Sequence, residues 1–193
     1  MKYSFLTFAM LMLWASLTAQ QTNIPIASKA QDLLRNSAVR NELSNSSDVL
    51  GIPFRSIGPS IMSGRVVDIK VNPDNTGDFF VAYASGGLWR TENMGTSFTP
   101  LFDHEQVITI GAFDVNWKTG EIWIGTGEVN SSRSSYAGMG VYHSKDWGKT
   151  WQHKGLENTH HIGKVIIDPE NPEKVWIASL GHLYSPGGGG LFT

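Results

Sequence analysis

The chain has 193 residues, of which 40% are hydrophobic and 17% are charged. These proportions are those of a globular domain with a core, and they exclude a disordered tail or linker. The absence of cysteine excludes a disulfide framework and a thiolate metal site. The formal charge of −2 argues against a nucleic-acid partner, because such proteins need a basic patch to displace counterions from phosphates.

The first 19 residues have the layout of a secretory signal peptide. Lys2 precedes an apolar stretch from Phe5 to Leu17, and cleavage is expected after Ala19. The stretch is shorter than the roughly 20 apolar residues that span a membrane, and a chain without cysteine has no lipobox. We therefore expect a secreted, periplasmic or cell-surface protein with no transmembrane segment after signal cleavage.

Residues 20–53 are expected to form a short helix followed by a linker. Ala30, Leu33, Leu34 and Val39 recur at the intervals of one helix face, and a polar Ser-Asn-Ser-Ser run follows them. The spacing predicts an amphipathic helix that precedes the main domain.

Residues 54–193 read as a series of short strands separated by clusters of Asn, Asp, Gly and Pro, with no helix between them. The pattern predicts an all-β domain. The expected strands are residues 66–71, 79–83, 87–91, 108–115, 121–125, 140–143, 164–167 and 175–178.

The strands repeat with a long period. Leu88, Val141 and Leu191 hold the same place in three similar stretches that lie 53 and 50 residues apart. A period near 50 residues is typical of four-stranded blades of a β-propeller. Because a propeller closes with about four to eight blades, under three blades indicate an incomplete N-terminal fragment of a longer protein, truncated at the C-terminus.

One motif in the second unit has a specific spacing. Ser144, Asp146, Gly148, Thr150 and Trp151 match Ser-x-Asp-x-Gly-x-Thr-Trp, which resembles the Asp-box, or BNR repeat. At this spacing Ser and Asp side chains can bond turn amides, Gly supplies a left-handed backbone and Trp packs on the hairpin. We expect a structural role for these five residues. A degenerate first copy has Thr91, Asn93 and Phe98 in the Ser, Asp and Trp positions.

The order of the motifs resembles a wider family. The stretches 55–69, 84–91 and 160–164, together with the Asp-box, are similar to the secreted bacterial propellers grouped with the sortilin (VPS10) N-terminal domain and often labelled BNR-repeat glycosyl hydrolases. The resemblance implies a large propeller with a ligand along its central channel or on one face.

The enzymes nearest to that family, the xyloglucanase-like glycosidases, use two carboxylic acids across a cleft. In those enzymes an Asp stands two positions before the Gly-Gly of the first blade, whereas this chain has Ala84 there. Alanine neither donates nor accepts a proton, so no catalytic residue is assigned to this chain.

Three residues of the long loop in the second unit are candidate ligand contacts. Glu128 lies in a Gly-rich loop that continues to Arg133 and Tyr136, and such loops often line the binding face of a propeller. The alternative for Glu128 is a turn acid or an ion-pair partner of Arg133. Arg65 and Asp68 are more typical of a structural pair than of a ligand site.

No cofactor or metal is expected. His160 and His161 would point to opposite faces of an extended strand and so would not share an ion with His182. Trp117 and Trp147, near loops, are either part of the packing or platforms for sugar rings.

These observations favour a secreted β-propeller module that binds a protein or polysaccharide ligand. One alternative is the N-terminal part of a BNR-repeat glycoside hydrolase with its acids on other blades, and a second is a structural scaffold within a larger surface protein.

Overall fold

The structure, a computed structural model, describes residues 29–49, 52, 64–130, 135–183 and 187–193. The expected signal peptide lies outside the described residues. The segment predicted to be helical contains helix α2 (Ala30–Asn45). Its apolar residues do not form a buried stripe, since Val39 is 47% and Leu43 is 66% exposed and, among helix residues 31–45, only Ser37 is buried.

The strands form three antiparallel sheets in chain order. The first sheet contains β1 (Val66–Val71), β2 (Phe79–Tyr83), β3 (Gly87–Thr91) and β4 (Thr99–Pro100). The second sheet contains β5 (Ile110–Asn116), β6 (Glu121–Thr126), β7 (Val141–Ser144) and β8 (Gln152–His153). The third contains β9 (Ile162–Ile167), β10 (Val175–Ser179) and β11 (Gly190–Phe192), and a 3-10 turn (Glu157–Thr159) precedes β9.

The eight predicted strands are all present. Three have the predicted bounds and the others differ by one or two residues at an end. The prediction missed β4, β8 and β11, which have only two or three residues each and therefore carry no readable alternation.

The second sheet is buried on both faces because its side chains alternate along each strand. Phe113, Ile122 and Tyr142 point to one face and pack with Phe80 and Leu88 of the first sheet. The opposite face of the same strands packs on the third sheet, through Ala112 and Val141 against Ile162, Val165, Ile167, Val175 and Ile177. Two apolar layers thus stack three sheets face to face.

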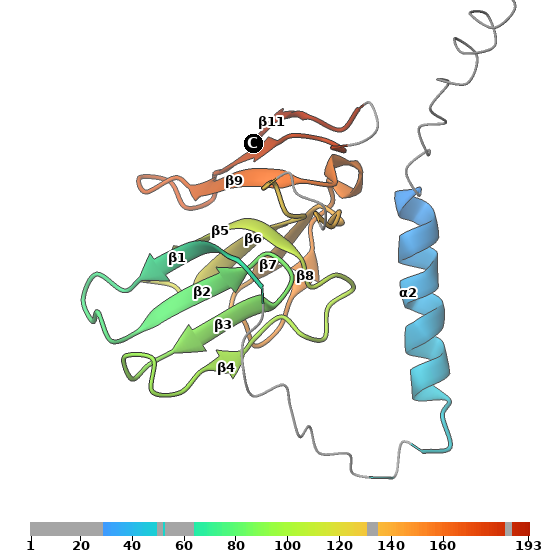
Figure 1. The fold of residues 1–193 in the computed structure, drawn as a ribbon, viewed down its shortest axis with the longest axis horizontal. Helices are drawn as coiled ribbons and strands as arrows, with labels where there is room; N and C mark the ends of the chain where they lie inside the picture. Colours follow the sequence, from blue (N-terminus) through green and yellow to red (C-terminus); the bar gives the residue numbers. More distant parts are fainter. Residues whose placement is uncertain (1–28, 50–51, 53–63, 131–134, 184–186) are drawn as a thin grey trace, which may run out of the picture.

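Each sheet is an antiparallel meander of three or four strands. Consecutive meanders stacked in this way are the blades of a β-propeller. The first strands of the sheets lie side by side, since β1 contacts β5 and β5 contacts β9 (Figure 1). The all-β class and the partial propeller predicted from the repeat are confirmed.

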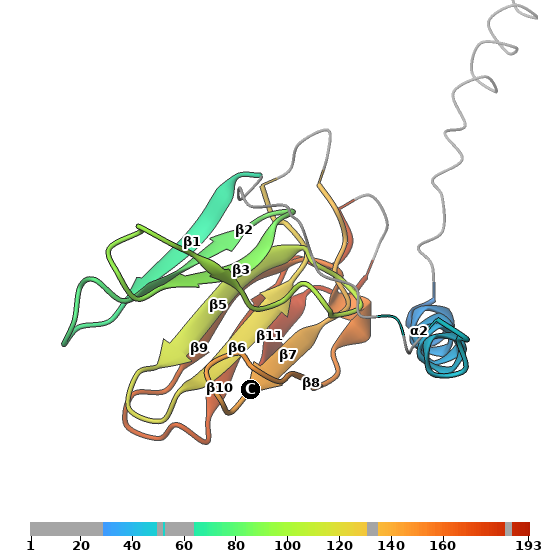
Figure 2. The ribbon, with the colours of Figure 1, turned by 90° about the horizontal axis from the view of Figure 1, so that it is seen from below.

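The strand connections separate into two ends of the sheets, because every strand reverses direction. The turn end carries the tight turns 72–78, 92–98, 117–120, 145–151 and 168–174. The loop end carries the start of β1 and the connections 84–86, 101–109, 127–140, 154–161 and 180–189. Helix α2 lies beside the loop end in both views (Figures 1 and 2).

The Ser-x-Asp-x-Gly-x-Thr-Trp motif forms the turn between β7 and β8, at the turn end. Ser144 Oγ accepts a hydrogen bond from the Gly148 N–H (2.8 Å), and Asp146 accepts from the Thr150 N–H (2.9 Å) and hydroxyl (2.6 Å). Gly148 has a φ of +81°. The Trp151 indole N–H donates to the Leu101 carbonyl at 2.7 Å, so the turn is also tied to the chain that leaves the first sheet.

The degenerate first copy makes the two equivalent bonds to backbone N–H groups with different residues. Thr91 Oγ1 accepts from the Gly95 N–H (2.9 Å), and Asn93 Oδ1 accepts from the Ser97 N–H (2.9 Å). An uncharged amide oxygen therefore replaces the carboxylate in the turn of the first sheet.

The turn of the second sheet gives a prediction for Asp146. Burial opposes its ionisation, but hydrogen bonds from Thr150 and Ser144 hold the pKa of the Asp146 carboxyl below its ordinary value. We expect Asp146→Ala to lower the free energy of unfolding by about 1–2 kcal/mol, and Asp146→Asn to lower it less, because Asn93 closes the equivalent turn.

The contribution of the Asp146 carboxylate to the free energy of unfolding is complete at pH values above its ordinary pKa of about 4. It is lost as the pH falls through the lower pKa that the carboxyl has in the folded state. Urea denaturation at pH 7 and pH 3 measures this. The wild type should lose more stability in acid than Asp146→Asn does, and equal losses would contradict the assignment.

Close contact between the second sheet and the connection that enters the third sheet depends on glycine. Gly127 has a φ of +89°, and a Cβ there would collide with the His160 carbonyl oxygen. Gly155 has nearly the same φ, +90°, but a Cβ there would meet no atom within 4 Å. The two glycines differ in contact and not in backbone conformation.

We therefore predict unequal effects of two matched substitutions. Gly155→Ala should lower the free energy of unfolding by about 1 kcal/mol, because alanine is strained in the left-handed backbone conformation. Gly127→Ala adds the collision with His160 and should cost at least about 3 kcal/mol. Thermal and urea denaturation of the two variants would measure the difference, and similar losses would show that the close approach is not required.

Within the described residues, no helix has the length and apolar character needed to cross a membrane.

Candidate functional site

An ion pair joins the first and second sheets at the loop end. Arg65 directly precedes β1, and Glu128 lies in the β6–β7 connection. The Arg65 Nε donates to Glu128 Oε1 at 2.8 Å, and its Nη2 donates to the same oxygen. The Glu128 side chain is fully buried, whereas that of Arg65 is 48% exposed. About half of the Arg65 side chain is therefore exposed to solvent, while the carboxylate of Glu128 is buried.

Glu128 is held by its backbone as well as by Arg65. Its N–H donates to the Tyr136 carbonyl (3.1 Å), and its carbonyl lies 2.7 Å from Nδ1 of His161. A carbonyl oxygen only accepts, so His161 Nδ1 carries the proton. Glu128 Oε2 is buried and has no hydrogen-bond partner among the described residues.

A depression of about 480 Å³ at the loop end is lined by residues 85, 106–109, 136 and 137, and its lining includes neither Arg65 nor Glu128. Its polar residues include Ser85, Gln106 and Thr109, and Tyr136, which is 54% exposed, also lines it. Hydroxyl and amide groups beside an exposed aromatic ring suit a ligand with both hydroxyl groups and C–H faces.

Hydrogen bonds link Arg65 to residues of the depression. Its carbonyl accepts from the N–H of Ala84, the residue before Ser85. Its side chain reaches Glu128, whose N–H is bonded to Tyr136. Arg65 is therefore linked to Ser85 through Ala84 and to Tyr136 through Glu128.

Helix α2 borders the same region. Leu33, Asn36, Ser37 and Arg40, which share one helix face, line a smaller hollow of about 220 Å³ together with Met139, Gln106 and Val107. Gln106 and Val107 also line the larger depression. The helix thus lies next to the candidate site and not at the turn end.

The predicted ligand residues have different positions. Tyr136 is exposed on the rim, Glu128 is buried behind Arg65, and Arg133 lies outside the described residues. The partner that the structure gives Glu128 is Arg65, which the sequence analysis had associated with Asp68. Asp68 lies 3.6 Å from the Lys70 ammonium instead.

Three histidines cluster at the loop end, close to Glu128. His160 and His161 were expected on opposite faces of an extended strand, but both contact His182, with ring centroids 4.8 and 6.0 Å from its own. They lie before β9, where His160 has a φ of +54°. Burial lowers the pKa of both, and neighbouring histidines lower it further, although the Glu128 carbonyl acts in the opposite direction on His161.

The described part of the chain contains no group of three or more His, Asp or Glu residues arranged to hold a metal ion. A hollow of about 410 Å³ between the second and third sheets has a mostly apolar lining that includes Trp123, Val141 and Ile177. That lining offers few groups for a polar ligand.

The structure also locates Ala84 and the two tryptophans that were considered as sugar platforms. Ala84 lies at the loop end and is 1% exposed. Trp117 and Trp147 lie at the turn end, where they pack on each other with ring centroids 5.9 Å apart, and Trp117 also packs on Phe80. Both indoles thus take part in packing between the first two sheets.

No protein-family model matches the sequence, and no curated protein matches it. Among solved structures, an ancestral GH74 enzyme is similar with 21% identity and a TM-score of 0.47, over 59% of this chain and 16% of that enzyme. The GH74 xyloglucanase from Xanthomonas campestris is similar with 15% identity and a TM-score of 0.35, over 57% of this chain and 20% of that enzyme.

The chain thus spans a fifth or less of the length of these two enzymes. Activity does not follow from likenesses of this extent, and the candidate site rests on the residues of this chain. The relation to sortilin and the BNR repeat stays a prediction.

Proposed function

We propose that the protein is an exported β-propeller module that binds a polysaccharide at its loop end. The observation that carries the proposal is the half-exposed Arg65 side chain, which the buried Glu128 holds and which is linked through Ala84 and Glu128 to Ser85 and Tyr136 of the depression. A guanidinium fork donates to hydroxyl oxygens in a defined direction, and an aromatic ring packs on the apolar face of a sugar.

The size and chemistry of the depression support this ligand class. A volume of about 480 Å³ lies within the range of small-molecule sites, roughly 300–1,000 Å³. Its lining has hydroxyl and amide groups and no charged side chain, which suits a neutral glycan better than a highly charged ligand.

Calorimetric titration of the protein with xyloglucan and β-glucan oligosaccharides tests the proposal. We expect Tyr136→Ala to weaken binding about tenfold, because stacking is lost. The double variant Arg65→Gln with Glu128→Gln should weaken it at least about tenfold, through loss of charged hydrogen bonds, while leaving no buried carboxylate unpaired.

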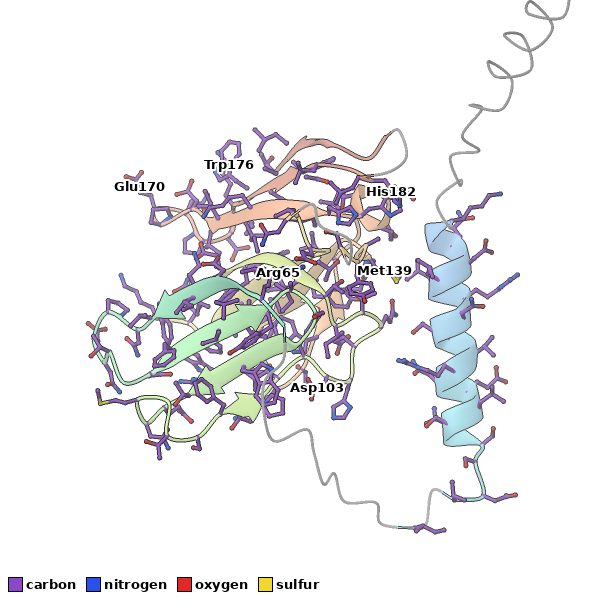
Figure 3. The ribbon with its side chains drawn as sticks, in the orientation of Figure 1. Arg65, Asp103, Met139, Glu170, Trp176 and His182 are labelled. Carbon is purple, nitrogen blue, oxygen red and sulfur yellow. The ribbon has the colours of Figure 1, made fainter. Side chains whose placement is uncertain are left out.

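The control variant is Glu170→Ala, which changes an exposed side chain at the turn end (Figure 3). It should bind as the wild type does. Unchanged binding by the site variants would place the ligand elsewhere. Shortened oligosaccharides in the product mixture would move the function to glycoside hydrolysis, and no binding to any glycan would contradict a polysaccharide ligand and favour a protein.

Export is the second part of the proposal, and it rests on the signal-peptide layout of residues 1–19. We expect the mature protein to begin at Gln20. Mass spectrometry of protein recovered outside the cytoplasm would measure this, and an intact Met1 terminus in that fraction would contradict cleavage.

A further inference from the structure

A continuous set of contacts crosses the three sheets at the loop end. It starts in the third sheet at His161, which directly precedes β9, passes through Glu128 in the second sheet, and ends at Arg65 in the first. Two of the three side chains are buried, and the last is exposed to solvent. The exposed guanidinium is therefore supported by groups from both of the other sheets.

His161 is held in place by the third sheet. Its carbonyl accepts from the Leu180 N–H at 2.9 Å and from the Ser179 hydroxyl at 3.1 Å. The same hydroxyl lies 2.9 Å from the Thr159 carbonyl and 3.1 Å from the Gly188 carbonyl. The imidazole is 1% exposed. Its position is thus set by β10 and by the connections on either side of it.

The bond from His161 to Glu128 has a direct geometric effect on the carboxylate. Glu128 sits in a connection whose backbone is anchored at Gly127, through the Thr109 carbonyl at 3.1 Å, and at Tyr136. Its own carbonyl has His161 as its bonded partner. Without that donor, the Glu128 peptide can rotate, and the direction of its side chain changes with it.

We propose that His161 is a positioning residue for the ligand site: by donating to the Glu128 carbonyl it sets the direction in which Glu128 holds the Arg65 guanidinium. The third sheet thereby controls affinity for a ligand that contacts only the first two. This inference rests on the proposed function, since it identifies the residue that adjusts the same site.

Two variants of His161 separate positioning from stability. In His161→Asn, the amide Nδ2 occupies the place of Nδ1, one bond from Cγ, and can donate to the Glu128 carbonyl. In His161→Leu, a side chain of similar size donates nothing. Both variants lose part of the imidazole packing, so both should show a lower melting temperature.

Titration with the oligosaccharides should then distinguish them. We expect His161→Leu to weaken binding about tenfold and His161→Asn to remain within about threefold of the wild type. A purely structural role for His161 would make affinity per folded molecule the same in both variants, which would overturn the proposal.

A double-mutant cycle shows whether His161 acts through the ion pair. In the background of Arg65→Gln with Glu128→Gln, the change His161→Leu should alter the affinity by less than about twofold. A full tenfold loss in that background would mean that His161 acts by another route.

A measurement without ligand separates this inference from the proposed function. The Arg65 Nε–H donates to Glu128 Oε1, so its hydrogen exchange reports how firmly the pair is held. Exchange followed by NMR should be about tenfold faster in His161→Leu than in His161→Asn. Equal rates would overturn the positioning role even if glycan binding were found, and the predicted difference would support it even if no glycan bound.

Discussion

The close approach of the second and third sheets is the constraint on which the loop end depends. The connection that leads into β9 passes directly over the second sheet at positions that have no side chain. A Cβ would collide with Ile162 at Gly111 and Gly125, with His160 at Gly127, and with Gly155 and Leu156 at Gly140. Without these glycines His161 could not reach the Glu128 carbonyl, and the support for Arg65 would be absent. Glycine therefore serves close packing between sheets here as well as turns.

Strand positions were predictable because alternation and β-branched runs are local signals. β1, β2 and β3 were located to the residue, while β4 and β8 were missed because two residues show no period. The Ser144–Trp151 turn was predictable because its bonds join residues two and four apart. The first copy does not match the motif strictly, because Asn93 stands in place of the aspartate. Its side chain still accepts the equivalent hydrogen bond from the N–H four residues later.

The candidate site was harder to predict from the sequence than the strands and turns. Glu128 and Tyr136 were singled out from a Gly-rich loop, but the Arg65–Glu128 pair joins residues 63 apart and the His161–Glu128 bond joins residues 33 apart. No local spacing reveals such pairs. The histidines were judged as strand residues, and the positive φ of His160 changed that geometry. Only the order of the sheets brings these side chains together, so the site depends on tertiary structure where the turns do not.

The short outer strands have a consequence for how the molecule meets other molecules. In the first and second sheets the outermost strand has only two residues, and one of the two in β4 is Pro100, which has no N–H to donate. A foreign β-strand approaching either rim would find few backbone groups in register. These rims are thereby protected against the edge-to-edge polymerisation that exposed sheets invite.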